Sequence, residues 1–357
     1  MHYSSCLITG GAGTFGSSYI IKAIENQWHE KLVVFSRDEY KQLKLSNLLK
    51  SRFKQDIIFS NDFSLKLKNC DVRFFIGDIR DYERVCLATK GIDLILHAAA
   101  LKHVPICEYN VEEAVNTNIN GTINVIKAAH AQGVSQVISL STDKSIHPTN
   151  LYGSSKMCLE KISLNYRYML GSETKFNVVR YGNVIGSRGS LIERLTSDDN
   201  DIPITDGSMT RFWIPIEKAI DLVRSTIKFN HNGCIFIPLM KALPIDLTFK
   251  WLRPNLTPRV IGPRGGEKTH ESMLTTEESL HAFLHSSCII IFPDASQHNI
   301  TNSPSPELIK HLNLSPLHCS EFLNYEKNPH YSSLHAEPFE KKEFLGLVKN
   351  TMVNDLR

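Results

Sequence analysis

Tyr152 and Lys156 are four residues apart in Tyr152-Gly-Ser-Ser-Lys156, a spacing that places both side chains on one face of a helix. An ammonium beside a phenol lowers the pKa of the phenol, and the phenolate can then accept a hydroxyl proton while hydride leaves the same carbon. The apolar run before this segment ends in Ser141-Thr142, where a hydroxyl would orient the alcohol. These residues predict the oxidation of an alcohol, which requires a hydride acceptor.

A glycine-rich loop near the start of the chain offers a place for such an acceptor. In Thr9-Gly-Gly-Ala-Gly-Thr-Phe-Gly16, the glycines at 10, 13 and 16 follow a strand-like run and precede a helix-like one. They permit a tight turn, close approach of the backbone to a pyrophosphate, and close packing of helix on strand, while the helix start offers free N–H groups. The loop predicts dinucleotide binding; the alternative interpretation is a structural turn.

The end of the second expected strand indicates which dinucleotide binds. Sites that prefer NAD place an acidic side chain there for the ribose 2′-hydroxyl, whereas this chain has Ser36, followed by Arg37 and Lys41. The two cations would neutralise a 2′-phosphate. Asp38 could still reach the ribose, and a solvated charge cluster is the alternative interpretation. The residues favour NADP.

Short apolar runs alternate with longer amphipathic stretches through the first half of the chain. The expected strands are 6–9, 31–36, 72–76, 94–97, 136–141 and 177–181, and the expected helices are 15–26, 40–54, 82–90, 111–132 and 152–168. This alternation predicts an α/β fold over residues 1–185, a doubly wound parallel sheet of the Rossmann type.

The pattern changes after about Gly186, where turn-rich stretches separate short helices and strands. We expect residues 186–285 to form a smaller substrate-binding region at the carboxyl ends of the strands, where ligands bind in this architecture. Residues 286–357 form a C-terminal extension, in which the pattern predicts little beyond a strand at 288–292.

Composition argues against several partners. The 40 basic and 37 acidic residues give a net charge of +3, which favours neither nucleic acid nor an anionic membrane. No apolar run approaches the roughly 20 residues of a membrane span, and the first residues lack a signal-peptide pattern. The 8 scattered cysteines are typical of a reducing compartment, so we expect a cytoplasmic protein. His281 and His285 have a zinc-like helical spacing but no further ligand, so no metal site is predicted.

Seven longer motifs make the chain similar to a known family. They are Ser36-Arg-Asp-Glu, Gly77-Asp78-Ile-Arg-Asp, His97-Ala-Ala-Ala-Leu-Lys-His-Val-Pro105, Ser141-Thr-Asp-Lys144, Arg180-Tyr-Gly-Asn-Val-Ile-Gly-Ser-Arg188, Met209-Thr-Arg-Phe-Trp213 and Arg264-Gly-Gly-Glu-Lys268. From Ser5 to about Met273 the chain resembles the extended short-chain dehydrogenases/reductases. Within them it is similar to the inverting UDP-N-acetylglucosamine 4,6-dehydratases, relatives of the polysaccharide-biosynthesis dehydratases.

The resemblance implies a reaction centred on Thr142, Asp143 and Lys144. Tyr152 would take the proton of the sugar 4-hydroxyl, Lys144 would remove the proton on carbon 5, and Asp143 would protonate the departing 6-hydroxyl. Retaining relatives have two acidic residues where this chain has Asp143-Lys144, so an acid and an amine indicate inversion at carbon 5. For these roles, burial would have to lower the pKa of Lys144 and favour the protonated acid. The alternative interpretation is a surface ion pair.

The resemblance also implies which residues bind ligands. Expected contacts of NADP are Gly10, Ala12, Gly13, Thr14, Phe15, Gly16, Ser36, Arg37, Asp38, Lys41, Asp78, Ile79, Ala98, Lys102, Leu140, Ser141, Tyr152, Lys156, Val184, Ser187 and Arg188. Expected contacts of a UDP-linked N-acetylhexosamine are Lys102, Asn183, Leu191, Thr210, Arg211, Arg264 and Glu267. Two segments depart from the family: Gly265-Gly266 replaces the usual Pro-Gly, and Tyr331-Ser-Ser-Leu-His335 is only loosely similar to the segment that closes over the substrate.

Other functions stay open on the same residues: a retaining dehydratase, a UDP-sugar 4-epimerase or 4-reductase, and a catalytically silent NADP-binding protein. An epimerase needs only Tyr152 and Lys156, which would leave Asp143 and Lys144 idle. A silent binding protein needs none of the four side chains. From the family we also expect a homo-oligomer.

Overall fold

The computed structural model describes residues 3–199, 201–229, 231–286, 288–292, 304–317 and 330–353. Its main feature is a large sheet. The strands are β1 (Ser5–Thr9), β2 (Lys31–Ser36), β3 (Ile57–Ser60), β4 (Ser64–Leu67), β5 (Asp71–Ile76), β6 (Leu94–His97), β7 (Gln136–Thr142), β8 (Lys175–Tyr181), β12 (Ile235–Pro238), β15 (Ala282–His285), β16 (Cys288–Ile291) and β17 (Ser315–Pro316). They lie side by side in the order β17-β15-β16-β12-β8-β7-β6-β1-β2-β5-β4-β3.

The centre of this sheet is parallel, from β5 through β2, β1, β6, β7 and β8 to β12. The strand order runs outward in both directions from the neighbours β1 and β6, which creates a crevice at their carboxyl ends. The predicted doubly wound parallel sheet is therefore confirmed, and all six expected strands are present with bounds within two residues of those predicted.

Both edges of the sheet are antiparallel, which the sequence pattern did not predict. β3 and β4 form a hairpin against β5, and β15, β16 and β17 extend the sheet beyond β12. The hairpin escaped prediction because β3 is short and its side chains at Ile58 and Phe59 are exposed, so it lacks the apolar alternation of a half-buried strand. The strand expected at 288–292 is β16.

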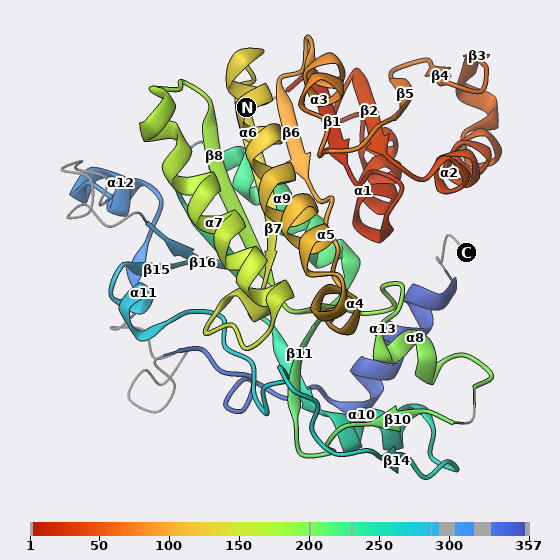
Figure 1. The fold of residues 1–357 in the computed structure, drawn as a ribbon, viewed down its shortest axis with the longest axis vertical. Helices are drawn as coiled ribbons and strands as arrows, with labels where there is room; N and C mark the ends of the chain where they lie inside the picture. Colours follow the sequence, from red (N-terminus) through yellow and green to blue (C-terminus); the bar gives the residue numbers. More distant parts are fainter. Residues whose placement is uncertain are drawn as a thin grey trace.

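Helices cover both faces of the sheet (Figure 1). Their bounds are α1 (Thr14–Glu25), α2 (Glu39–Arg52), α3 (Tyr82–Thr89), α4 (Val104–Tyr109), α5 (Val111–Val115), α6 (Gly121–Ala131), α7 (Leu151–Leu170), α8 (Leu191–Leu195), α9 (Ile216–Phe229), α10 (Ile245–Leu252), α11 (Thr276–Leu280), α12 (Pro306–His311) and α13 (Lys341–Val353). The helix expected at 111–132 consists of α5, a π-helical turn at Asn116–Asn120, and α6.

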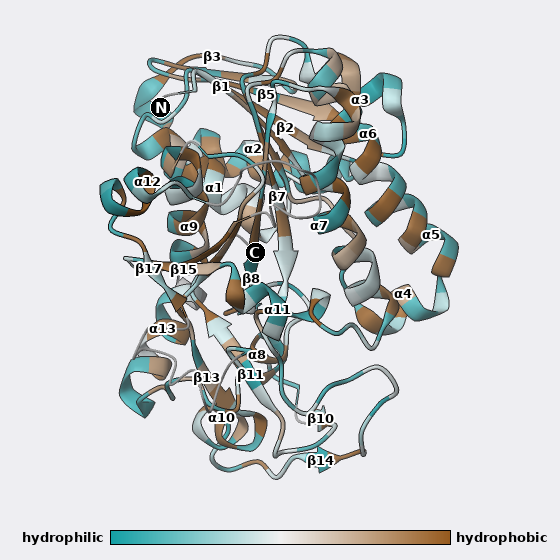
Figure 2. Cartoon of the chain, turned by 90° about the vertical axis from the view of Figure 1, so that its left-hand side faces the viewer, coloured by the Kyte–Doolittle hydropathy of each residue, from teal (hydrophilic) through white to brown (hydrophobic). Residues whose placement is uncertain are grey.

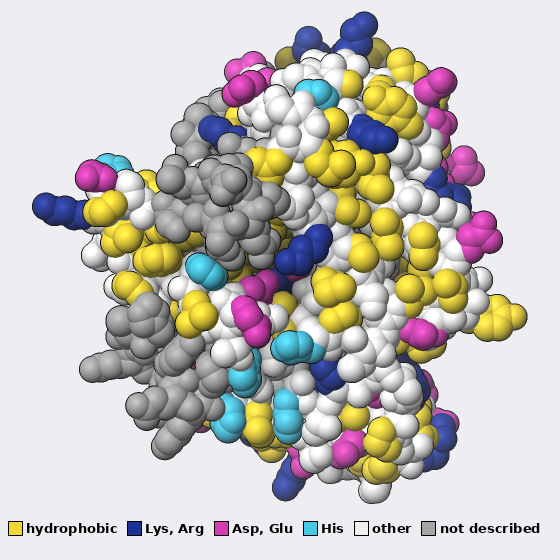
Figure 3. Space-filling view, turned by 60° about the vertical axis from the view of Figure 1, so that its left-hand side comes forward, with side chains coloured by type: hydrophobic (Ala, Val, Ile, Leu, Met, Phe, Trp, Pro, Cys, Tyr) yellow, Lys and Arg dark blue, Asp and Glu magenta, His cyan; other side chains and the backbone are white. Residues whose placement is uncertain are grey.

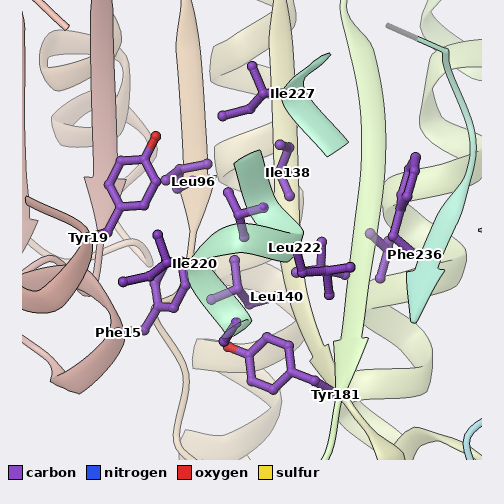
Figure 4. Packing of buried hydrophobic residues seen from close by; sticks show 14 of the residues in the cluster. Phe15, Tyr19, Leu96, Ile138, Leu140, Tyr181, Ile220, Leu222, Ile227 and Phe236 are labelled. Carbon is purple, nitrogen blue, oxygen red and sulfur yellow. The ribbon is translucent and has the colours of Figure 1, made fainter. Parts of the chain in front are cut away.

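Alternating side chains of the central strands build a core on each face. Ile8 of β1 packs with α1 and α9, whereas its neighbour Leu7 packs with α3 and α6. Figure 4 shows the first of these cores, where side chains of α1 and α9 meet those of β6, β7, β8 and β12. Figure 2 shows the same arrangement as hydrophobic residues along the strands and on the helix sides that face them.

A smaller lobe lies below the sheet in Figure 1. It contains a three-stranded sheet in the order β13 (Lys241–Pro244), β11 (Thr210–Ile214), β9 (Asn183–Val184), and a two-stranded one of β10 (Pro203–Ile204) and β14 (Arg259–Val260). A third core, with Trp213 and Phe344, joins these strands to α8, α10 and α13. The lobe is not continuous in sequence, because α9 and β12 return to the large sheet. Among the described residues, no helix is long and apolar enough to cross a bilayer.

Candidate active site

A cleft of about 780 Å³ lies between the carboxyl ends of the parallel strands and the smaller lobe. Segments from Gly10 to Glu267, distant in sequence, line it together. It coincides with the crevice at which the strand order reverses, where ligands of this architecture bind. Of the site residues predicted from the sequence, all line this cleft except Asp143 and Thr210.

The glycine loop forms a close-packed turn at one end of the cleft. Gly10 has φ +67°, and a Cβ there would lie 2.9 Å from the Ala99 nitrogen, so both conformation and space require glycine. A Cβ at Gly16 would lie 2.5 Å from Gly11 Cα, which explains why helix and loop approach so closely. Gly13 caps α1 without a side-chain hydrogen bond, which leaves the N–H groups of the first turn for a ligand. This geometry fits the pyrophosphate of a dinucleotide.

The cations predicted to recognise a 2′-phosphate are already paired with acids. Lys41 Nζ lies 2.6 Å from Asp38 Oδ2, and Arg37 Nη1 lies 3.4 Å from Asp78 Oδ2. Asp38 also caps α2, since its Oδ1 accepts a hydrogen bond from the Lys41 backbone N–H at 2.9 Å. Asp38 is thus occupied by the helix start, and both cations are close enough to the cleft to turn toward a phosphate.

Tyr152 and Lys156 lie on the first turns of α7 and line the same cleft. Burial lowers the pKa of Lys156 to about 8, and its Nζ donates to the carbonyl oxygen of Leu140 at 2.6 Å. The pKa of Tyr152 is raised to about 12, chiefly by burial, and the cation that most opposes this rise is Lys144. The pKa of Tyr152 therefore lies above its usual value, against the expected lowering, because burial outweighs the charge of Lys144.

Lys144 lies between two carboxylates, which reverses the predicted direction of its pKa. Burial alone would lower the pKa, but Asp143 and Glu271 raise it well above its usual range. Lys144 Nζ is 3.0 Å from Asp143 Oδ1, 3.6 Å from Glu271 Oε1 and 3.4 Å from Asn183 Oδ1. The expected lowering is thus wrong, since two ion pairs stabilise the ammonium more than desolvation destabilises it.

Asp143 lies behind Lys144 and is fully buried, so the pair is not a surface ion pair. Its Oδ1 accepts hydrogen bonds from Thr142 Oγ1 at 2.8 Å and from Lys144 Nζ. Its Oδ2 is buried without a hydrogen-bond partner among the described atoms. An unpaired buried carboxylate oxygen is costly to the folded state.

A buried ion network fixes the loop that carries this pair. Glu160 of α7 accepts hydrogen bonds from the hydroxyls of Ser141 and Ser145, one on each side of the Asp143–Lys144 pair. Arg180, fully buried on β8, holds Glu160 at 2.6 Å and Glu278 at 2.9 Å. The end of β7 is therefore held by α7, β8 and α11 together.

Successive side chains of β11 point alternately to the cleft and to the interior of the lobe, as in any strand. Arg211 and Trp213 line the cleft, whereas Thr210 faces away from it. The Thr210 hydroxyl bonds to His270 Nδ1 at 2.8 Å and to Ser333 Oγ at 2.6 Å. Thr210 therefore has its contacts inside the lobe, while Asn183, Leu191, Arg264 and Glu267 line the cleft as expected.

Several residues at the cleft were not found from the sequence. Those that line it include Thr117, His103, Arg194, Thr205 and Trp213. Thr117 lies in the π-helical turn, a local irregularity typical of functional sites, but no sequence pattern indicated it. Glu271 was also missed; it lies three residues after the end of the Arg264–Lys268 motif, and that proximity was the only signal available.

The described residues include no group of three or more side chains able to hold a metal ion. Figure 3 shows several histidine side chains near one another on one face, beside exposed acidic groups. His281 and His285 do not share a helix: the first caps α11 and the second lies on β15. The helical zinc spacing read from the sequence therefore has no structural basis.

The fold and the cleft define a Rossmann-type, nucleotide-binding class of enzyme with a Tyr-x-x-x-Lys pair beside the cofactor loop. Among solved structures, DesIV, a dTDP-glucose 4,6-dehydratase from Streptomyces venezuelae, has the same fold with a TM-score of 0.62 at 20% identity, over 74% of this chain and 86% of that one. The chain belongs to the polysaccharide biosynthesis protein family, whose model matches residues 6–293. The family recognised from the motifs is confirmed.

Two of the relatives found by sequence similarity are named for different activities. A Campylobacter jejuni protein named UDP-N-acetylglucosamine 4,6-dehydratase (inverting) is 42% identical over 278 residues, 76% of this chain and 78% of that protein. A Rickettsia bellii protein named UDP-glucose 4-epimerase is 38% identical over 287 residues, 77% of this chain and 79% of that protein. The X-ray structure of Pen from Bacillus thuringiensis, 34% identical, covers 99% of both chains with a TM-score of 0.81.

Proposed function

We propose that this protein removes water from UDP-N-acetylglucosamine across carbons 5 and 6, with oxidation at carbon 4 and inversion at carbon 5. The product would be a UDP-2-acetamido-2,6-dideoxy-L-hexos-4-ulose for glycan or polysaccharide biosynthesis. The 42% identity to the inverting dehydratase supports the reaction class. The observation that carries the proposal is the ion pair of Lys144, which lines the cleft together with Tyr152, and Asp143, which is buried directly behind Lys144.

The cofactor in this proposal is NADP. A bound dinucleotide supplies a hydride acceptor that returns the hydride later, so none is consumed. The loop at Gly10–Gly16 fits its pyrophosphate, and Asp78, Ile79 and Ala98 line the cleft beside it. The absence of an acid at Ser36, together with Arg37 and Lys41, supports NADP over NAD.

Tyr152 would begin the reaction as its phenolate, a form that the nearby charge of Lys144 stabilises, by accepting the proton of the 4-hydroxyl. Lys156 holds the end of β7 through the Leu140 carbonyl, and its lowered pKa keeps it ready to exchange protons near neutral pH. Thr142 Oγ1 donates to Asp143 and accepts from the Lys144 backbone N–H at 3.4 Å, which leaves one lone pair to orient the sugar hydroxyl. Oxidation at carbon 4 acidifies the proton on carbon 5.

The Asp143–Lys144 pair would then carry out the elimination. One proton lies between Lys144 Nζ and Asp143 Oδ1, which are 3.0 Å apart. Its transfer from nitrogen to oxygen gives the amine and the acid that the step uses, with no change in net charge. Lys144 removes the proton on carbon 5, Asp143 protonates oxygen 6, water leaves, and the ion pair is restored. A proton from solvent, added to carbon 5 from the opposite face as the hydride returns to carbon 6, would give the L configuration.

The rest of the cleft supports a UDP ligand. Arg211 and Arg264 are placed to bind the diphosphate by charge-assisted hydrogen bonds. Asn183, Leu191 and Glu267 line the same region, and Lys102 joins it to the cofactor side through its bond to the Arg188 carbonyl at 2.7 Å. Residues 1–185 would form the cofactor domain and 186–285 the substrate region, apart from α9, β12 and β15, which belong with the large sheet. Only part of 286–357 is described, and its described residues contribute to both.

Assembly and location belong to the proposal as well. We propose a cytoplasmic homo-oligomer. Exposed apolar side chains at Ile106, Tyr109 and Val111, on neighbouring helices α4 and α5, support association of copies. Light scattering of the purified protein measures the assembly, and a mass of 40.4 kDa would contradict it.

Product analysis tests the function directly. The purified protein is incubated with UDP-N-acetylglucosamine in deuterated water, and NMR follows carbons 4, 5 and 6. A 4-keto, 6-deoxy sugar with deuterium and inverted configuration at carbon 5 supports the proposal. The D configuration at carbon 5 identifies a retaining dehydratase. A 4-epimer without a ketone identifies an epimerase, the activity named for the Rickettsia relative, and an unchanged sugar identifies a silent binding protein.

A further inference from the structure

Glu271 is a buried carboxylate with three cations around it and no role in the steps above. Its residue is only 2% exposed, although it lies directly behind the cleft. Glu271 Oε1 is 3.6 Å from Lys144 Nζ and 4.0 Å from Arg211 Nε, and Oε2 is 3.1 Å from Lys268 Nζ. Oε1 therefore faces both Lys144, the proposed base, and Arg211, proposed to bind the diphosphate. Oε2 faces Lys268, which lies outside the cleft.

The C-terminal segment holds Glu271 in this place. The Glu271 backbone N–H donates to Ser333 Oγ at 2.9 Å, and the Ser333 N–H donates to the Glu271 carbonyl at 2.8 Å. Ser333 Oγ also bonds to Thr210 on β11, next to Arg211. Lys268 is fixed in turn, because its Nζ donates to the Ile146 carbonyl at 2.6 Å. Glu271 is thus held through its backbone by Ser333 and through Oε2 by Lys268.

Charge explains why an acid belongs at this position. Lys144, Lys268 and Arg211 bring three positive charges into a poorly solvated region, and Asp143 alone would leave two of them uncompensated. The same cations hold the pKa of Glu271 below its usual value although burial would raise it, so the group remains an anion. A neutral side chain here would leave the ammonium of Lys144 with Asp143 as its only acidic partner among the described residues.

We propose that Glu271 is a positioning residue of the elimination step, which holds Lys144 Nζ between itself and Asp143 so that the amine faces carbon 5. The inference rests on the proposed dehydratase function and adds a residue to it. Glu271 acts through Lys144: among the described residues it forms ion pairs with Lys144, Arg211 and Lys268. Its loss should therefore slow the elimination and leave the preceding oxidation at carbon 4 intact.

The test separates these two half-reactions in Glu271→Gln. Rapid mixing with UDP-N-acetylglucosamine follows the reduced nicotinamide, and quenched samples report the 4-keto-6-deoxy product. We expect elimination to slow between about 10- and 100-fold, as for a displaced catalytic group, while oxidation keeps its rate within about twofold. Reduced cofactor should then accumulate transiently in the variant. Each protein is measured at the pH where it is fastest, which removes differences in Lys144 protonation.

Glu278→Gln is the matched control. Glu278 is a partly buried acid of the same segment, but it pairs with Arg180 behind the site at 2.9 Å. We expect it to lower the Tm and to change both half-reactions by the same factor. If Glu271→Gln does not fold, Ser333→Ala serves instead; it removes the bond to the Glu271 N–H and should shift the same ratio in the same direction, by less.

The outcomes separate the two proposals. An unmutated protein that forms no ketone contradicts the dehydratase function itself. An unmutated protein that forms the ketone, with a Glu271→Gln variant whose two half-reactions slow equally or not at all, overturns the positioning role alone. Accumulation of reduced cofactor in Glu271→Gln but not in Glu278→Gln supports it.

Discussion

The protonation state of the Lys144–Asp143 ion pair decides whether these two residues can act as base and acid in the elimination. Lys144 is held as an ammonium by Asp143 and Glu271, and this favours the resting form rather than the free base. A base of this kind works only if its proton has a nearby acceptor, and Asp143 Oδ1 at 3.0 Å is that acceptor. Catalysis then depends on the geometry of the pair more than on the bulk pH.

Lys144→Ala should separate water loss from cofactor binding. Removing a general base costs about 100- to 10,000-fold in rate, so we expect almost no 6-deoxy product. The lysine lies beyond the residues that bind the dinucleotide, so the Kd of NADP should remain within about twofold of the unmutated value. Tyr152→Phe should fail earlier and form no reduced cofactor. Reduced-cofactor absorbance and product NMR measure both effects; normal water loss in Lys144→Ala would falsify its role as base.

Arg37→Ala should weaken NADP selectively. The guanidinium now pairs with Asp78 at 3.4 Å and is half exposed, so it can turn to a 2′-phosphate. We expect a loss of about 1–3 kcal/mol in NADP affinity and almost none in NAD affinity, measured by calorimetry. Lys68→Ala, which breaks an exposed pair with Asp56 far from the cleft, is the control and should change neither. Equal affinity of the unmutated protein for both dinucleotides would contradict the NADP assignment.

At the scale of elements, the functional side chains lie at the carboxyl ends of the strands. Polar side chains at those ends hold the strands in place. His97 at the end of β6 shows how. Its Nδ1 bonds to Thr9 Oγ1 of β1 at 2.8 Å, and its Nε2 to Thr122 Oγ1 of α6 at 3.0 Å. The Thr122 hydroxyl donates to the Asn118 carbonyl, so the ring is neutral with its proton on Nε2. A single histidine thereby joins two strands and a helix below the cofactor loop.

Because burial lowers the pKa of His97 to about 3, this junction should be acid-sensitive. In the unfolded chain His97 has its ordinary pKa of about 6.5, so below that pH it binds a proton that it does not bind in the folded state. The free energy of unfolding therefore decreases as the pH falls from about 6.5 toward 3. Above pH of about 6.5 the contribution is fully present. His97→Gln keeps one donor and one acceptor without the titration. In urea unfolding, the advantage of the unmutated protein over this variant should shrink by about 2 kcal/mol between pH 7 and pH 5; a constant advantage contradicts the assignment.

At the scale of the whole molecule, the C-terminal region completes the lobe that faces the cofactor domain. α13 lies beyond the part of the chain matched by the family model, yet its Phe344 is fully buried against Trp213, Trp251 and Phe339. Lys241 of β13 pairs with Glu343 of the same helix at 2.9 Å. Strand β11, which carries Arg211 into the cleft, is thus supported from behind by the end of the chain.

Phe344→Ala should loosen this lobe while the cofactor domain survives. Truncation of a buried phenylalanine costs about 3–5 kcal/mol, and the loss should appear as weaker binding of UDP with NADP affinity retained. Phe63→Ala is the matched control, since Phe63 is 71% exposed on the β3–β4 hairpin and its loss should change stability by less than about 0.5 kcal/mol. Urea unfolding and calorimetry with UDP measure both. Equal losses of UDP and NADP binding would show that the two lobes do not separate in this way.

Local patterns in the sequence were enough for the central strands, the helices between them, the glycine loop and the Tyr152–Lys156 pair. Each of these depends on near neighbours: a two-residue or 3.6-residue period, a turn that only glycine can make, or one helical turn between two side chains. Other features depend on residues far away in the chain. They are the antiparallel edges of the sheet, the direction of the Thr210 side chain into the lobe, the place of Glu271 beside Lys144, and the protonation of Lys144. Burial and charge at those positions are sums over neighbours that only folding brings together, so no local pattern could predict them.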